Sequence, residues 1–289
     1  MVGADGGPAV LGVLGVGVVD PSTPVIRADD PGVTRGDGCF EGCRLQVGAD
    51  GIGVIDKLDA HLARMTRSAA SLEIPFDEPA WRALVAETAA EWTHPGEAAV
   101  KLLLTRGPAS GGGPAGFVWI TPLPADYPRL RRDGLRVITL DRGVGSAAFA
   151  GAGWLLGGVK TLSYAINVAA QREGARRGAD DVLFVSADGM VLEAPTGSVV
   201  WSFDRTLHTT PTGASGILAG TTQRLLFERA AAAGWRTADT RATLDELHAA
   251  DVVWLVSSVR GPVDVVELDG KARTRLPAVD AEIRRLCGF

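Results

Sequence analysis

Lys160 stands alone in a long uncharged stretch of the chain. Residues 145–158, just before it, are rich in glycine and alanine and carry no charge, and the next charged residue after it is Arg172. A lysine in such surroundings is either a surface lysine whose alkyl stem lies along apolar groups, or a partly desolvated lysine whose neutral amine can attack a carbonyl. Composition alone favours the surface lysine.

Other residue types that carry chemistry are sparse. The four histidines lie outside HExxH and Gly-x-Ser-x-Gly contexts, so metal-dependent hydrolysis and triad chemistry have no support. GVLGVG at 12–17 is not GxGxxG and indicates a strand with close packing, and GGG at 111–113 indicates a mobile loop. Three cysteines without CxxC spacing predict neither a metal site nor a disulfide framework.

The elements that must position Lys160 follow from the apolar pattern. Its 3.6-residue period predicts helices at 58–74, 78–93, 161–176, 221–234 and 243–249. Strand-like runs are VLGVGVVD, CRLQVGADGIGVID and AVKLLLTRG, and later LRVITL, DDVLFVSADGMVLEA, SVVWSF and DVVWLVSS. The Asp-Gly of SADG, at 186–189, predicts a tight hairpin. Lys160 is therefore expected at the head of a helix.

Three prolines, Pro122, Pro124 and Pro128, fall within one short stretch, which is typical of a linker between domains. We therefore expect an N-terminal α/β domain at 1–121, a linker at 122–130 and a C-terminal domain at 131–289. The length suits two domains, each able to bury its own core.

Five short motifs follow one another in order: RGDGCFEGCRL (35–45), HLARMTRSA (61–69), KTLSY (160–164), DGMVLE (188–193) and GTT (220–222). Each is weak alone, and their joint order is specific. Together they resemble the class IV aminotransferase family, enzymes of fold type IV that use pyridoxal 5'-phosphate (PLP). The resemblance covers about 33–265. It implies an α/β fold with a smaller N-terminal α/β domain and a larger C-terminal PLP-binding domain, a mixed β-barrel-like sheet with helices.

The resemblance implies roles for two residues at the reacting end of the cofactor. Lys160 would hold PLP as a Schiff base and shuttle the proton, which requires a neutral amine in a shielded site. Glu193 would face the pyridine nitrogen, where a carboxylate stabilises the protonated ring. Without the resemblance, Glu193 would be interpreted as an exposed carboxylate after a hairpin.

Further roles concern the rest of the cofactor and the substrate. By resemblance, Arg64 would bind the cofactor phosphate, as would Thr221 and Thr222 at a helix start. A solvated helix face and an ordinary N-cap are the alternatives for these residues. Tyr164 would bond the phenolic oxygen of PLP, and Phe40 of the GDGxFE-like strand would contact the substrate.

Some positions depart from the family pattern. Ser163 and Ser198 stand where asparagines are usual, Gln223 stands where the G-I-T-R stretch has arginine, and SSVR at 257–260 replaces a threonine-rich turn. These changes leave the principal cofactor anchors in place. They bear on the substrate more than on the cofactor.

Three activities share this scaffold: 4-amino-4-deoxychorismate lyase, which makes 4-aminobenzoate and pyruvate for folate synthesis, and D-amino acid and branched-chain transamination. D-amino acid enzymes resemble each other in an Arg-x-His carboxylate trap after a TRG strand end. Here TRG at 105–107 is followed by PASGGGPAG. We favour the lyase, with a D-amino acid or branched-chain aminotransferase as the alternative, including as a second activity of the same site.

The partners expected from composition are small molecules. A net charge of -5 argues against nucleic acid, which needs clustered cations. The apolar run at 9–19 is too short to span a bilayer and follows no basic segment, so we expect a cytoplasmic protein without a membrane partner. The family resemblance implies a homodimer.

Overall fold

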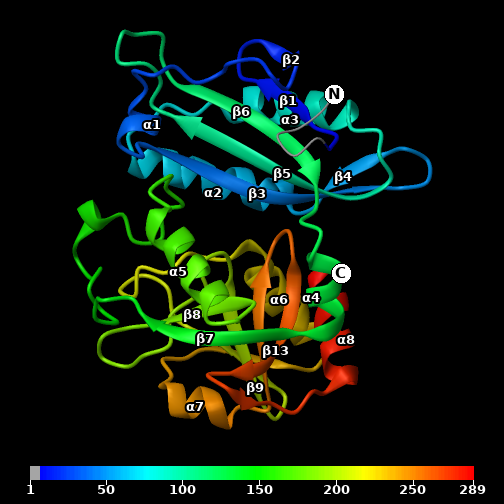
Figure 1. The fold of residues 1–289 in the computed structure, drawn as a ribbon, viewed down its shortest axis with the longest axis vertical. Helices are drawn as coiled ribbons and strands as arrows, with labels where there is room; N and C mark the ends of the chain where they lie inside the picture. The colour runs from blue at the N-terminus through cyan, green and yellow to red at the C-terminus, as the bar shows by residue number, and fades with distance from the viewer. Residues whose placement is uncertain (1–6) are drawn as a thin grey trace. The chain divides into compact units, whose positions relative to one another are not determined.

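The computed structural model describes residues 7–289 (Figure 1). The chain forms two compact units. The first holds the described residues through Pro124 together with Val159–Tyr164, and the second holds Ala125–Gly158 and Ala165–Phe289. The chain therefore leaves the first unit and returns to it for the short segment that carries Lys160.

The first unit is built on an antiparallel sheet in the order β2-β1-β6-β5-β3-β4. Its strands are β1 (Val10–Val13), β2 (Gly17–Val19), β3 (Gly38–Val47), β4 (Gly53–Ile55), β5 (Gly96–Thr105) and β6 (Ala115–Pro122). β3 and β5 pair along their whole length. Because side chains alternate along a strand, Phe40 and Glu41 of β3 point to opposite faces of the sheet.

Two helices cover one face of this sheet (Figure 1). The helices of the unit are α1 (Pro31–Thr34), α2 (Leu58–Ser71) and α3 (Glu78–Ala90). Leu62 and Met65 of α2 and Trp81 of α3 are fully buried in one core with Leu45 and Leu102 of the sheet. Burying such side chains is the main source of the unit's stability.

The predicted helices 58–74 and 78–93 are confirmed with shorter C-terminal ends. After α2, Glu73 adopts a left-handed conformation with φ 54°, and the Ile74 N–H donates to the Ala69 carbonyl at 2.9 Å. Such a turn satisfies end carbonyls and stops the helix. α3 begins at its N-cap Asp77, whose side chain accepts from the Ala80 N–H.

The second unit is built on an eight-stranded mixed sheet, ordered β11-β10-β9-β12-β13-β7-β8 with β14 beside β13. The strands are β7 (Leu135–Asp141), β8 (Asp181–Val185), β9 (Ser198–Phe203), β10 (Thr206–Thr209), β11 (Arg236–Asp239), β12 (Val252–Ser257), β13 (Gly261–Leu268) and β14 (Lys271–Ala272). β7 pairs in parallel with β8 and β13, and β10 with β11. The predicted α/β fold is confirmed.

Helices flank the strands of the second unit. They are α4 (Tyr127–Asp133), the 3-10 helix Gly153–Leu155, α5 (Ala165–Arg176), α6 (Thr221–Ala232), α7 (Leu244–Ala249) and α8 (Pro277–Cys287). α6 and α8 pack on each other and on the sheet, with Leu226, Trp254 and Ile283 in a shared core. The predicted hairpin at 186–189 is confirmed, because the Ser186 N–H donates to the Met190 carbonyl at 2.8 Å.

None of the helices formed by residues 7–289 is long and apolar enough to cross a membrane.

Candidate active site

Lys160 lies on an extended segment, which corrects the prediction that it opens a helix. The Phe40 N–H donates to the Lys160 carbonyl at 3.1 Å, and the Leu162 N–H donates to the Gly38 carbonyl at 2.9 Å. Residues 160–162 therefore pair with the start of β3, and α5 begins only at Ala165. Pairing with a distant strand overrides the local helical pattern, because it satisfies the same backbone groups.

Two aromatic rings hold the Lys160 amine. Its Nζ lies 4.3 Å from the centroid of the Phe40 ring and 5.5 Å from that of Tyr164. The two rings meet edge to face with centroids 5.2 Å apart. Ring faces attract an ammonium group and shield it from water. Three residues singled out from the sequence thus lie together, with the side chain of Lys160 half-buried.

Arg64 is part of a buried polar cluster that sequence reasoning missed. Its Nε and Nη2 donate to the two carboxylate oxygens of Glu41, each at 2.7 Å, and His61 Nδ1 lies 2.7 Å from Glu41 Oε2. Glu41 and His61 are fully buried and Arg64 is 6% exposed. The solvated-helix interpretation of Arg64 is therefore wrong. Glu41 stood inside the GDGCFEG motif, but only the packing of α2 on β3 reveals its partner.

The charges in this cluster are set by burial and by Arg64. Burial alone would raise the pKa of Glu41, but the adjacent guanidinium and its hydrogen bonds lower that pKa to about 2. Burial lowers the pKa of His61 despite its bond to Glu41. The carboxylate is therefore ionised and the imidazole neutral at ordinary pH. A neutral imidazole bonded to a carboxylate carries its proton on Nδ1.

Glu193 lies in the second unit, just after the 186–189 turn. Its backbone pairs with Phe184 of β8, and its Oε2 accepts the Leu218 N–H at 3.1 Å. The side chain is half-buried. The interpretation as an exposed carboxylate after a hairpin is therefore wrong, since the carboxylate is held against the loop that leads to α6.

Thr221 and Thr222 form the start of α6, together with a third hydroxyl. Ser258 Oγ lies 2.8 Å from Thr221 Oγ1 and 3.0 Å from Thr222 Oγ1. Gly220 is the N-cap and provides no side-chain cap. The positive end of a helix dipole beside three hydroxyls suits an anion. Ser258 follows β12 directly. Its place in the SSVR stretch was the only feature of the sequence that could have indicated a role in this site.

Each unit, taken by itself, carries groups of the kinds that a pyridoxal phosphate needs. The first unit supplies a primary amine between aromatic rings and a buried guanidinium, and the second supplies a carboxylate and a helix start with three hydroxyls. An aldehyde, a phosphate and a pyridine nitrogen require these partners. The residues present therefore fit this cofactor.

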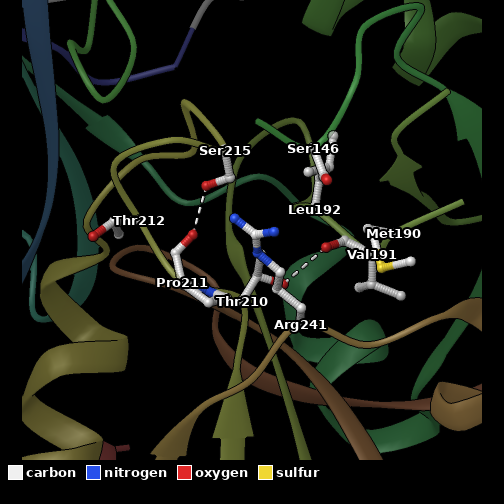
Figure 2. Close-up of a pocket in the computed structure, with 9 residues that line it drawn as sticks. All are labelled: Ser146, Met190, Val191, Leu192, Thr210, Pro211, Thr212, Ser215 and Arg241. Atoms are coloured by element: carbon white, nitrogen blue, oxygen red, sulfur yellow. Dashed lines mark hydrogen bonds between the residues drawn. The ribbon is translucent and has the colours of Figure 1, made fainter. Parts of the chain in front are cut away.

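Two cavities lie within the second unit. The smaller, about 20 Å³, is lined by Ser146, Thr210, Ser215, Arg241 and neighbours, and is large enough for about one water molecule (Figure 2). The larger, about 280 Å³, lies along the start of α6, where Ser198 and Gln223 both line it. Two positions that depart from the family pattern therefore share one cavity.

The comparison with known proteins decides the family. The model of the amino-transferase class IV family matches residues 38–268. The chain belongs to the class IV aminotransferase family. Members of this family use PLP, so the protein is an enzyme of a PLP-dependent aminotransferase and lyase family. The resemblance inferred from the five motifs, and the cofactor it implied, are confirmed.

Individual relatives agree with this placement. A bifunctional aminodeoxychorismate lyase / D-amino acid transaminase of Mycobacterium tuberculosis is 38% identical over 272 residues, covering 91% of this chain and 92% of that protein. A hypothetical aminotransferase from Mycobacterium tuberculosis in its PLP-bound form superposes with a TM-score of 0.90 at 38% identity, covering 97% of this chain and 98% of that chain. The fold IV-transaminase CpuTA1 from Curtobacterium pusillum superposes with a TM-score of 0.88 at 38% identity, covering 97% of each chain.

Proposed function

We propose that this class IV enzyme is a 4-amino-4-deoxychorismate lyase, which releases 4-aminobenzoate and pyruvate, and that D-amino acid transamination is a second activity of the same site. The similarity to the bifunctional Mycobacterium tuberculosis enzyme over nearly the whole chain supports both activities. A D-amino acid or branched-chain aminotransferase without lyase activity is the alternative.

The observation that carries the lyase proposal is the lack of a charged carboxylate clamp in the residues that follow β5. Arg106 donates to the Asp37 carboxylate at 2.5 Å and to the Leu72 carbonyl at 2.6 Å, so it caps α2 and bonds a neighbouring acid. Residues 107–114, which follow, contain no charged residue and no histidine. A transaminase must hold an α-carboxylate in both half-reactions, which favours a charged clamp. The lyase has a bulkier substrate and one half-reaction.

In this proposal Lys160 carries out the chemistry and a second group of residues binds the phosphate. PLP supplies an electron sink. Lys160 Nζ would hold the cofactor through its aldehyde carbon, whose oxygen leaves as water, and the free amine would move the proton of the substrate carbon that bears the amine. Arg64 would bind the phosphate, as would Thr221, Thr222 and Ser258. The last set is supported by the contacts of Ser258 Oγ with both threonine hydroxyls.

The remaining assignments concern the ring and the substrate. Glu193 would hold a proton at the pyridine nitrogen, and its hydrogen bond from the Leu218 N–H fixes the carboxylate. Tyr164 would donate a hydrogen bond to the phenolic oxygen of the cofactor. Phe40, whose ring lies under the Lys160 amine, packs against the substrate and excludes water from it. Aromatisation of the substrate ring drives departure of the three-carbon fragment.

A side-by-side assay tests the proposal directly. The purified holoenzyme should release 4-aminobenzoate and pyruvate in equal amounts from 4-amino-4-deoxychorismate. In a separate assay with α-ketoglutarate as the amino-group acceptor, it should form pyruvate from D-alanine more slowly. Strong transamination of D-alanine without any 4-aminobenzoate would sink the lyase proposal and promote the aminotransferase.

Glu193→Gln should separate the two activities. The amide keeps an oxygen for the Leu218 N–H but loses the charge that retains a proton on the pyridine nitrogen. Transamination places developing charge in the cofactor ring alone, whereas the lyase reaction draws part of its driving force from aromatisation of the substrate. D-alanine transamination should therefore fall further than 4-aminobenzoate release, by a factor of about ten, or about 1.4 kcal/mol in the barrier.

The control for this variant is Glu91→Gln, which makes the same change at the exposed C-cap of α3. It should alter neither rate. Equal losses of the two activities in Glu193→Gln would contradict this prediction, because they would mean that both reactions depend equally on the protonated pyridine ring.

We also propose that the protein is a homodimer. Trp154 and its neighbour Leu155 are 79% and 47% exposed, and Ile166 of α5 is 55% exposed, and large apolar side chains left at a surface commonly mark an interface. Sedimentation should give twice the chain mass, and Trp154→Ser should shift the protein toward the monomer. A fully active wild-type monomer would contradict this.

A further inference from the structure

Glu41 and His61 orient the Arg64 side chain. Glu41 lies on β3, and His61 and Arg64 lie one turn apart on α2, on the face that packs against that strand. Glu41 Oε1 accepts from Arg64 Nε, and Glu41 Oε2 accepts from both Arg64 Nη2 and His61 Nδ1. All three distances are 2.7 Å. Both carboxylate oxygens and one whole edge of the guanidinium are therefore engaged.

This arrangement fixes a direction as well as a position. Two parallel N–H···O bonds to one carboxylate set the plane of a guanidinium, because the fork is rigid and planar. Because the Nε–Nη2 edge faces Glu41, the direction in which the remaining N–H groups of the guanidinium point is fixed as well. His61 Nδ1–H holds the carboxylate that holds the fork.

The same elements also position Lys160. Ser68 lies on α2 one turn beyond Arg64, and its Oγ accepts the Lys160 N–H at 3.3 Å. The Lys160 segment pairs with the residues of β3 that precede Glu41. The Arg64 guanidinium and the Lys160 backbone are thus both held by contacts with α2 and β3 of the first unit.

We propose that Glu41 is a positioning residue for the cofactor, which holds the Nε–Nη2 edge of Arg64 so that the guanidinium faces the cofactor phosphate, and that His61 fixes Glu41 in turn. This rests on the proposed role of Arg64 as a phosphate ligand. Simple electrostatics gives the opposite expectation, because the Glu41 charge repels a phosphate and its removal would tighten binding. The sign of the effect therefore decides between orientation and charge.

Glu41→Gln is the decisive substitution. A glutamine keeps one oxygen for one Arg64 N–H but sets its own N–H₂ group against the donors that faced the second oxygen. At least part of the fork is released. Because this leaves a buried cation without its counter-charge, Glu41→Asp serves as a second variant that keeps the charge and withdraws the carboxylate by one methylene.

The measurement compares PLP with pyridoxal, which lacks the phosphate. Both form the same bond to a lysine amine, so the ratio of their Kd values isolates the phosphate contribution. Glu41→Gln and Glu41→Asp should each reduce the preference for PLP over pyridoxal by about tenfold, since an oriented charge-assisted bond is lost. A purely structural role would weaken both ligands alike and leave the ratio unchanged.

The matched control is Glu97→Gln in the same unit. Glu97 Oε1 accepts from Nη1 of the buried Arg44 at 2.5 Å, so the variant disturbs another carboxylate and arginine pair. It should lower the melting temperature without changing the ratio. His61→Asn keeps a donor near the Nδ1 position and should preserve the ratio, whereas His61→Leu, of similar size, should reduce it.

The outcomes separate this inference from the proposed function. If Arg64→Leu leaves the ratio unchanged, Arg64 is no phosphate ligand, and both the proposed role and this inference are overturned. If Arg64→Leu abolishes the preference while folded Glu41→Gln and Glu41→Asp keep or increase it, the inference alone is overturned. Adding Glu41→Gln to Arg64→Leu should change the ratio no further, because the two residues act through one contact.

Discussion

Lys160→Ala is expected to yield a folded protein in which borohydride fixes no PLP and in which both activities fall by about 10²–10⁴-fold. A primary amine is needed to bond the aldehyde and to move the proton, and Lys160 is the lysine held between Phe40 and Tyr164. Peptide mapping of the reduced wild type should find the modification at Lys160 and not at Lys57, Lys101 or Lys271.

Two further variants test whether the loss is chemical. Lys160→Arg keeps a cation over the Phe40 ring and should preserve the melting temperature, yet it should remain inert to borohydride trapping because a guanidinium does not form the bond. Lys101→Ala removes an exposed lysine from β5 and should behave as wild type. PLP fixed by borohydride to Lys160→Ala would refute the assignment.

The elements that carry local signals could be predicted from the sequence. α2 and α3 show a strong helical period, and the Asp-Gly turn at 186–189 is a short-range hairpin signal, so each was placed correctly to within its ends. The order of the five motifs predicted the family, since the matched family model spans all of them except the first residues of the first.

The contacts that build the site depend on distant parts of the chain. Lys160 was expected on a helix, but its segment pairs with Gly38 and Phe40, more than a hundred residues earlier, and no local pattern signals that pairing. The partnership of Glu41 with Arg64 likewise needs α2 to pack on β3. Ser258 meets Thr221 only because β12 ends beside the start of α6. Tertiary packing creates such contacts, whereas residue types in the sequence can suggest only which residues take part.

Arg64→Ala is expected to weaken PLP retention by about 2–4 kcal/mol, or roughly 30- to 1000-fold in Kd. The proposal makes its guanidinium the buried cation that compensates the phosphate. Equilibrium dialysis of the variant against PLP gives the value directly. Arg67→Ala removes the same charge from the exposed side of α2 and should leave the Kd unchanged. Unchanged affinity in Arg64→Ala would show that the guanidinium serves only Glu41.

Loss of Arg64 should also reverse how Glu41 makes stability depend on pH. In the wild type the folded pKa of Glu41 is about 2, below its ordinary 4.5, so its contribution to the free energy of unfolding is complete above pH 4.5 and is lost as the pH falls toward 2. Without Arg64, burial, the largest influence on Glu41, is opposed by the hydrogen bond and charge of His61, and we expect burial to prevail and to raise the pKa of Glu41 above its ordinary value. Glu41 then favours folding when protonated, and its contribution is lost as the pH rises through that higher pKa.

Denaturant unfolding from pH 4 to pH 8 should therefore show Arg64→Ala losing stability relative to wild type as the pH increases. Arg64→Ala/Glu41→Gln, which has no carboxyl to titrate, should remove that slope, and a slope that survives in the double variant would place the titrating group elsewhere.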